Sequence, residues 1–227
     1  MIRVFIGYDQ NETVAYHVLA HSILRLSSEP VSITPLVLSQ LPLTRPRDAK
    51  QSTDFAFSRF LVPWLCGYKG TAIFLDCDML VRGDIAQLKG EPGKAVSVVK
   101  HDYTPKAGAK FLGNPQAAYA RKNWSSVMVF DCSACPMLTP QYVNEASGLE
   151  LHQFRWLGGE YQIGALDPAW NHLVGEYAPN PHAKLAHFTL GGPWFAGYRS
   201  CEFADEWRQE WDRMLSSKQP DKVKAAA

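Results

Sequence analysis

The sequence lacks several features that define large protein classes. No apolar run approaches the roughly 20 residues that are needed to span a bilayer. The N-terminus, MIRVFIGYD, has neither the basic start nor the long apolar stretch of a signal peptide. Because 23 Lys and Arg residues balance 22 Asp and Glu residues, no bulk charge draws the chain toward nucleic acid. These absences predict a cytoplasmic protein without a nucleic-acid partner.

Cysteine is also scarce, and the five residues are scattered at Cys66, Cys77, Cys132, Cys135 and Cys201. An odd, dispersed set predicts free thiols in a reducing compartment. Cys132 and Cys135 have the spacing of a redox or zinc pair, but no second pair accompanies them. We interpret them as packing residues.

The chain has no internal repeat, low-complexity block or linker, which predicts one domain over residues 1–217 and a flexible tail over 218–227. Apolar runs predict strands over 1–7, 31–38 and 71–75, the last buried on both faces. Helical spacing predicts helices over 13–26 and 57–65. This alternation indicates an α/β fold, and shorter strands are expected over 95–99, 127–130 and 184–188.

Two acidic residues, Asp76 and Asp78, come directly after the strand predicted over 71–75. In an extended chain, residues i and i+2 point the same way, so both carboxylates face the crevice at the carboxyl end of the sheet. Two like charges this close repel each other, and hard oxygen ligands select magnesium or manganese. The pattern predicts a metal site; the alternative is a pair of solvated carboxylates at a strand end.

His187 is the best candidate for a third ligand. It lies in a short apolar run that leads into the glycine turn Gly191-Gly192, and adjacent glycines let the backbone approach a bulky anion closely. The alternative is a histidine at a strand end that is hydrogen-bonded to the backbone.

Residues 68–84, which contain Asp76-Cys77-Asp78, resemble the Asp-x-Asp segment of glycosyltransferase family 8, the retaining GT-A enzymes that include bacterial lipopolysaccharide galactosyl- and glucosyltransferases and glycogenin. Asp9-x-Asn11 and residues 57–60, 123–130 and 187–194 resemble further segments of that family, in the same order. The resemblance implies a GT-A nucleotide-diphospho-sugar transferase fold with a mixed, mostly parallel sheet flanked by helices. It also implies metal-dependent transfer of a hexose from a nucleotide-diphosphate sugar, usually a UDP-sugar, to a saccharide or lipid-linked acceptor with retention of configuration.

The resemblance also implies roles for individual residues. Manganese or magnesium would be held by Asp76, Asp78 and His187. The positions implied for the nucleotide sugar are Tyr8, Asp9, Asn11, Arg59, Cys77, Asn123, Ser125, Gly191 and Gly192. Glu160 and Gln162, together with the two aspartates, are the implied catalytic residues. The asparagine that contacts the donor corresponds to Asn123, Trp124 or Ser125.

Three positions depart from the family pattern. Glu12 replaces the aromatic residue that usually follows the base-binding asparagine, and Gly192 stands where the family places a lysine on the diphosphate. Arg59 or Lys184 could supply the missing charge. Glu160-Tyr161-Gln162 stands where the family has Asp-Gln-Asp.

Two mechanisms and two other functions remain open. The leaving phosphate takes the acceptor proton in the favoured mechanism, whereas Glu160 acts as a nucleophile in the second. One other function is a phosphohydrolase of the haloacid dehalogenase type, with Asp76 as the nucleophile. The other is a binding protein that has lost turnover.

The C-terminal segment has an apolar stripe of Phe203, Trp207, Trp211 and Leu215, each four residues after the last. This spacing predicts the inner face of a docked helix. Lysines in the tail leave the alternative of a peripheral contact with the inner face of the membrane.

Overall fold

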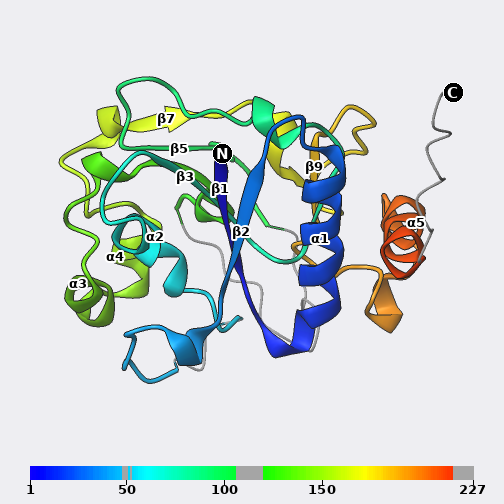
Figure 1. The fold of residues 1–227 in the computed structure, drawn as a ribbon, viewed down its shortest axis with the longest axis horizontal. Coiled ribbons are helices and arrows are strands. Elements are labelled where there is room, and N and C mark those ends of the chain that lie inside the picture. Colours follow the sequence, from blue (N-terminus) through cyan, green and yellow to red (C-terminus); the bar gives the residue numbers. More distant parts are fainter. Residues whose placement is uncertain (48–50, 52, 106–119, 217–227) are drawn as a thin grey trace, which may run out of the picture.

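The computed structural model describes residues 1–47, 51, 53–105 and 120–216. The main sheet has the strand order β2-β1-β3-β6-β5-β7 (Figure 1). Its strands are β1 (Ile2–Gly7), β2 (Val31–Leu36), β3 (Thr71–Leu75), β5 (Val96–Val98), β6 (Val127–Asp131) and β7 (Ile163–Ala165). The β1–β2, β1–β3 and β5–β7 pairs are parallel, whereas β6 is antiparallel to both β3 and β5. The sheet is therefore mixed and mostly parallel, as expected.

A second, smaller sheet has the order β4-β9-β8. It consists of β4 (Met79–Val81), β8 (His172–Leu173) and β9 (Leu185–His187). β9 is antiparallel to β4 and parallel to β8. The sequence predicted β9 but not this sheet, because strands of two or three residues carry no readable periodicity.

The helices are α1 (Thr13–Leu26), α2 (Val62–Leu65), α3 (Pro140–Glu145), α4 (Gly148–His152) and α5 (Ala204–Leu215). α1 matches its predicted bounds. The helix expected over 57–65 is instead a 3-10 turn, Ser58–Leu61, followed by the single turn of α2. Pro63 lies in the first turn of α2, where its missing N–H leaves no hydrogen bond unmade.

α5 packs outside α1, at the end of the molecule where the described chain finishes (Figure 1). Trp207 is buried and Trp211 half-buried in a second apolar cluster that also contains Val18 of α1 and Phe188. The stripe is therefore turned inward, except for Leu215, which is 64% exposed. The tail predicted over 218–227 lies outside the described residues.

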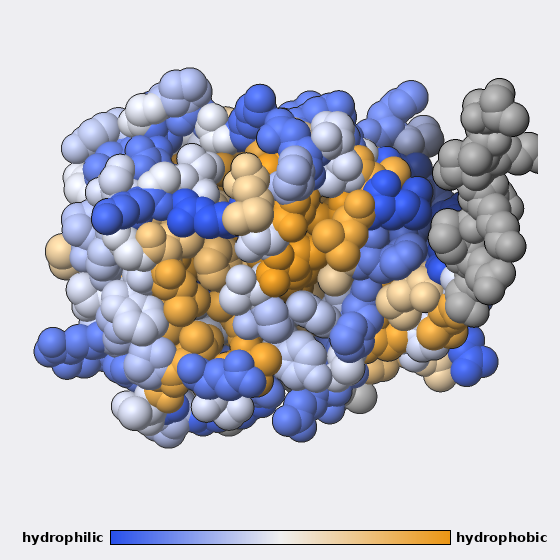
Figure 2. All heavy atoms as spheres, in the orientation of Figure 1, coloured by the Kyte–Doolittle hydropathy of each residue, from blue (hydrophilic) through white to orange (hydrophobic). Residues whose placement is uncertain are grey.

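The surface in view is largely hydrophilic, with apolar side chains gathered between β2 and α1 (Figure 2). β2 is an edge strand, and its Val31 and Ile33 are only half-buried against the main core. Among the described residues, no helix has the length and apolar character required to cross a bilayer.

Candidate functional site

The two sheets meet at the aspartate pair. Asp76 follows β3, and its backbone N–H donates to the Ser126 carbonyl at 3.0 Å. β4 begins at Met79, which lies opposite His187 in the β4–β9 register. The Phe188 N–H donates to the Asp78 carbonyl at 2.8 Å. Strand pairing therefore brings His187 beside Asp78, although more than a hundred residues separate them in the chain.

Asp76, Asp78 and His187 converge as the sequence predicted. Each offers one ligand atom, and these atoms all lie within 4.8 Å of one another. The His187 Nε2 and Asp78 Oδ1 atoms are 3.4 Å apart, and both residues are buried. The other ring nitrogen, Nδ1, lies 2.9 Å from the Asn171 Oδ1 atom. Two carboxylates and an imidazole are thus oriented toward one point.

Arg59 holds one of these carboxylates in place. Its guanidinium lies 2.8 Å from the Asp76 Oδ1 atom and donates to the Ser125 carbonyl, also at 2.8 Å. The same guanidinium lies over the Phe55 and Phe74 rings, at 5.3 and 5.0 Å from their centroids. Arg59 therefore provides a buried positive charge directly beside the candidate metal ligands.

Lys184, the other residue considered for the missing diphosphate charge, lies elsewhere. Its ammonium donates to Gln87 and lies over the Trp170 ring. It precedes His187 by three residues of extended chain, about 10 Å at the usual rise per residue. Of the two candidates, Arg59 is the one that contacts the cluster.

Glu12 is a third acidic residue at this site, and its role was missed from the sequence. It is 1% exposed; its Oε2 atom faces the Cys77 thiol at 3.9 Å, and its Oε1 atom has no hydrogen-bond partner. Burial raises the pKa of Glu12 well above its ordinary value, and the charges of Asp78, Asp9 and Asp76 raise it further. The sequence could have indicated this position, because Glu12 follows the strand predicted over 1–7. That strand is β1, the parallel neighbour of β3.

Cys77 is fully buried and lies against Glu12, as the alternation of side chains between two aspartates requires. Burial, followed by the charge of Glu12, raises the pKa of its thiol well above the ordinary value. At this position the thiol is an interior group that faces Glu12.

The loop after β1 is organised by Asp9. Its Oδ1 atom accepts from the backbone and amide nitrogens of Asn11, at 2.9 and 3.0 Å, and its Oδ2 atom accepts from the Asp54 N–H at 3.0 Å. The Tyr8 hydroxyl lies 3.1 Å from the Thr13 hydroxyl. The Asp9 carboxylate thus fixes the conformation of the loop that the resemblance assigns to the nucleotide base.

Asn123 and Ser125 face different surroundings. Asn123 has a left-handed backbone, with φ of 62°, and its amide donates to the Tyr103 hydroxyl at 2.8 Å. The same amide lies 3.4 Å from the hydroxyl of Thr189, two residues after His187. The Ser125 hydroxyl instead forms a hydrogen bond with the half-buried His152 ring at 2.7 Å. Of these two residues, Asn123 is the one whose side chain lies on the His187 side.

The turn at Gly191 and Gly192 requires glycine for packing reasons. Gly191 has φ of 139°, and a Cβ atom there would lie 2.6 Å from the Tyr198 ring. A Cβ atom on Gly192 would lie 2.0 Å from the Trp194 ring. The Gly191 N–H donates to the Phe188 carbonyl at 2.8 Å, which closes the turn directly after the strand that carries His187.

Glu160 and Gln162 lie on a 3-10 turn before β7. The Glu160 side chain is 82% exposed and pairs with Arg121. The Gln162 Oε1 atom accepts from the Gly158 N–H at 2.6 Å. The hydrogen bonds and ion pair of these two side chains are therefore within their own loop and with the segment that precedes Asn123.

Solved structures identify the class of fold. WbbM, a bifunctional glycosyltransferase, matches with a TM-score of 0.64 and 14% identity over 92% of this chain, which spans about half (49%) of that protein. The galactosyltransferase LgtC, solved with donor and acceptor sugar analogues, matches with a TM-score of 0.61 and 10% identity over 96% of this chain and 98% of its own. The chain therefore has the GT-A glycosyltransferase fold, which confirms the predicted fold class and removes the haloacid dehalogenase alternative.

The sequence itself identifies the family. Protein CDI of Arabidopsis thaliana is 44% identical over 223 residues, covering 92% of this chain and 86% of that protein. This chain belongs to the same family as Protein CDI. No protein-family model matches the chain.

Proposed function

We propose that this chain is a metal-dependent glycosyltransferase of the family 8 type. It would move a hexose from a nucleotide-diphosphate sugar, a UDP-sugar by family habit, to a saccharide or lipid-linked saccharide with retention of configuration. The observation that carries this proposal is the convergence of Asp76, Asp78 and His187 at the carboxyl end of β3 in a GT-A fold. The sugar analogues bound to LgtC support a sugar donor and a sugar acceptor.

The donor atoms fit manganese or magnesium. Ligand atoms at about 2.1 Å from one ion lie up to about 4.2 Å apart. The three candidate atoms lie within 4.8 Å of one another, so a small inward movement would let one ion contact all three. Carboxylate oxygens suit both ions, and the single imidazole favours a transition metal such as manganese over magnesium. When bound there, the ion supplies Lewis-acid stabilisation for the leaving diphosphate.

The residues of the chain would position the metal ligands and stabilise the leaving diphosphate. Arg59 holds the Asp76 carboxylate. The turn at Gly191 and Gly192 follows the strand that carries His187, so its backbone would lie close to the diphosphate. One well-placed hydrogen-bond donor in a water-poor cleft is worth about 3 kcal/mol in the transition state. We propose that the leaving phosphate takes the acceptor proton and that Glu160 does not act as a nucleophile on the donor sugar, because Glu160 is paired with Arg121 at the surface.

The remaining expectations stay proposals. These are a single domain over residues 1–217, a cytoplasmic location and a peripheral contact with the membrane through α5. Because Trp207 and Trp211 are turned inward, such a contact would involve the exposed Leu215.

A thermal-shift experiment tests the proposed function. The melting temperature of the full chain is measured with UDP- and GDP-sugars, with and without manganese. We expect one nucleotide sugar to raise it only when manganese is present, because only the folded site binds the pair. Asp78→Asn should abolish this rise, whereas Asp205→Asn, at an exposed acid of α5, should retain it.

Turnover is then measured with the sugar that stabilises the chain. Transfer or hydrolysis of that sugar supports the enzyme, whereas binding without turnover supports the binding-protein alternative. Equal stabilisation with and without manganese, or an Asp78→Asn variant with full turnover, would remove the metal from the mechanism.

A further inference from the structure

Asn171 is a buried polar residue that has no assigned role in the proposed reaction. It ends a 3-10 turn, Pro168–Asn171, immediately before β8, and it is 0% exposed. Its side-chain oxygen lies 2.9 Å from the His187 Nδ1 atom. Its side-chain nitrogen donates to the Ser126 hydroxyl at 2.8 Å and to the Asn123 carbonyl at 3.3 Å.

These contacts fix the orientation of the amide. The Asn123 carbonyl can only accept a hydrogen bond, so the atom that faces it is the amide NH₂ group. The Ser126 hydroxyl donates its own proton to the same carbonyl at 2.7 Å, which leaves its lone pairs to accept from Asn171. The remaining atom of the amide, which faces His187, is therefore the carbonyl oxygen.

The amide orientation determines the tautomer of His187. Because an amide oxygen only accepts, the proton of the neutral imidazole lies on Nδ1, and Nε2 carries the lone pair. That lone pair faces the Asp78 Oδ1 atom at 3.4 Å. Two acceptors face each other without a proton to share, which is the arrangement that a cation between them would satisfy.

We infer that Asn171 is a positioning residue that holds the His187 imidazole with Nδ1 protonated and Nε2 presented to a divalent cation. This inference rests on the metal site of the proposed function. Residues that hold a metal-binding histidine in this way tune metal affinity without touching the ion. The same amide also anchors the carbonyl of Asn123, so one side chain ties the metal ligand to the turn that the resemblance places near the donor sugar.

The first test reads the tautomer directly in the metal-free full chain. ¹⁵N NMR of histidine-labelled protein, assigned with His187→Gln, should show His187 with a protonated Nδ1. In Asn171→Leu, which keeps a similar volume but has no acceptor, the proton should shift toward Nε2. A wild-type spectrum with Nε2 protonated would overturn the inference, whether or not the variant folds.

The second test measures manganese affinity from the electron paramagnetic resonance signal of free Mn²⁺. Asn171→Leu should bind manganese about 10- to 100-fold more weakly than the wild type. Asn171→Asp, which keeps an acceptor for Nδ1, should bind it more tightly than Asn171→Leu does. Equal affinities of wild type and Asn171→Leu would overturn the inference. A wild-type chain that binds no manganese would count against the proposed function. The tautomer measurement would still test whether Asn171 positions the His187 imidazole.

Discussion

Arg59 shows how a single residue can hold a candidate metal ligand in place without being a ligand itself. It is buried between two aromatic rings, and its guanidinium contacts both the Asp76 carboxylate and the backbone that leads into β6. The sequence placed it near the donor diphosphate. In the structure its direct partner is a metal-ligand candidate, so its charge also offsets the repulsion among Asp76, Asp78 and the neighbouring acids.

Replacing this guanidinium should destabilise the fold. Arg59→Met retains much of the volume but leaves the Asp76 charge without its partner, which typically costs about 3 kcal/mol in the free energy of unfolding. Urea denaturation measures this loss. The double variant Arg59→Met with Asp76→Asn should recover part of it, and simple additivity of the two changes would contradict the coupling.

Cys66 is a second residue with an unusual environment. A hydrogen bond from the Cys132 thiol, opposed by burial and aided by the charge of Arg3, lowers the pKa of Cys66 to about 7. Burial instead raises the pKa of Cys201, which is also partly exposed, to about 11. The two thiols should therefore differ in reactivity at neutral pH, because the thiolate is the nucleophile.

Alkylation by iodoacetamide, followed by mass spectrometry, measures this difference. The rate at Cys66 should rise with pH and reach half of its maximum at about pH 7. Cys201 serves as the internal control and should react slowly across the same range. Cys132→Ala removes the hydrogen-bond donor and should shift the Cys66 profile to higher pH; an unchanged profile would contradict the proposed cause.

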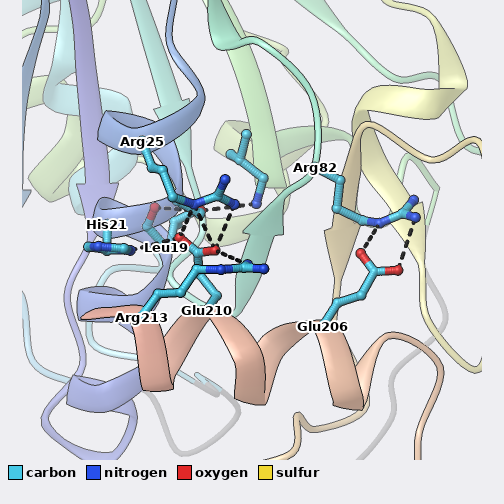
Figure 3. A network of polar contacts seen from close by, with 9 residues as sticks. Leu19, His21, Arg25, Arg82, Glu206, Glu210 and Arg213 are labelled. Carbon is cyan, nitrogen blue, oxygen red and sulfur yellow. Dashed lines mark hydrogen bonds and ion pairs between the residues drawn. The ribbon is translucent and has the colours of Figure 1, made fainter. Parts of the chain in front are cut away.

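Among the elements, α5 is attached to the rest of the fold in part through one buried carboxylate, that of Glu210. Glu210 is 1% exposed and accepts from Arg25 at 2.7 Å, His21 at 2.7 Å and Arg213 at 3.2 Å (Figure 3). Arg82 pairs with Glu206 one turn earlier on the same helix. These contacts join α5 to α1 and to β4, the strand that follows the aspartate pair.

Glu210→Gln should loosen this attachment. Burial alone would raise the pKa of Glu210, but the hydrogen bonds from Arg25 and His21 outweigh it and lower the pKa below the ordinary 4.5. The charged carboxylate therefore contributes stability above pH 4.5, and this contribution disappears as the pH falls through the lower value of the folded state.

Urea denaturation of wild type and Glu210→Gln measures the effect. Because the partners left behind are partly exposed, the variant should lose about 2 kcal/mol at pH 7. The difference should shrink below pH 4.5. Asp205→Asn, at a largely exposed acid of the same helix, should change little at either pH. A difference in the free energy of unfolding that is constant with pH would show that the shape of the side chain, rather than its charge, matters at position 210.

The elements differ in how well the sequence predicts them. α1 and β3 have long or strongly apolar patterns, and their bounds were predicted to the residue. β4 and β8 were missed, because each is stabilised by pairing with a distant strand rather than by its own composition. The helix expected over 57–65 became two short turns, because its apolar spacing does not reveal where the backbone tightens.

At the scale of the whole molecule, the convergence of the three candidate metal ligands was predictable and their surroundings were not. Asp76, Asp78 and His187 stood out because their residue types and the apolar runs before them indicate strand ends. Glu12 follows the strand predicted over 1–7 and could have been recognised on that ground. Asn171 carries no such signal, since its importance arises from burial against partners far away in the chain. Long-range strand pairing sets these positions, and local sequence does not encode it.

The β4–β9 pairing has a consequence for synthesis of the chain. A ribosome that has released only the first 180 residues has produced both aspartates and Arg59 but no partner strand for β4, so His187 is not yet available. Until β9 emerges, the proposed metal site would consist of two carboxylates without the imidazole. On the proposed function, the cation would therefore be held firmly only after β9 has paired with β4.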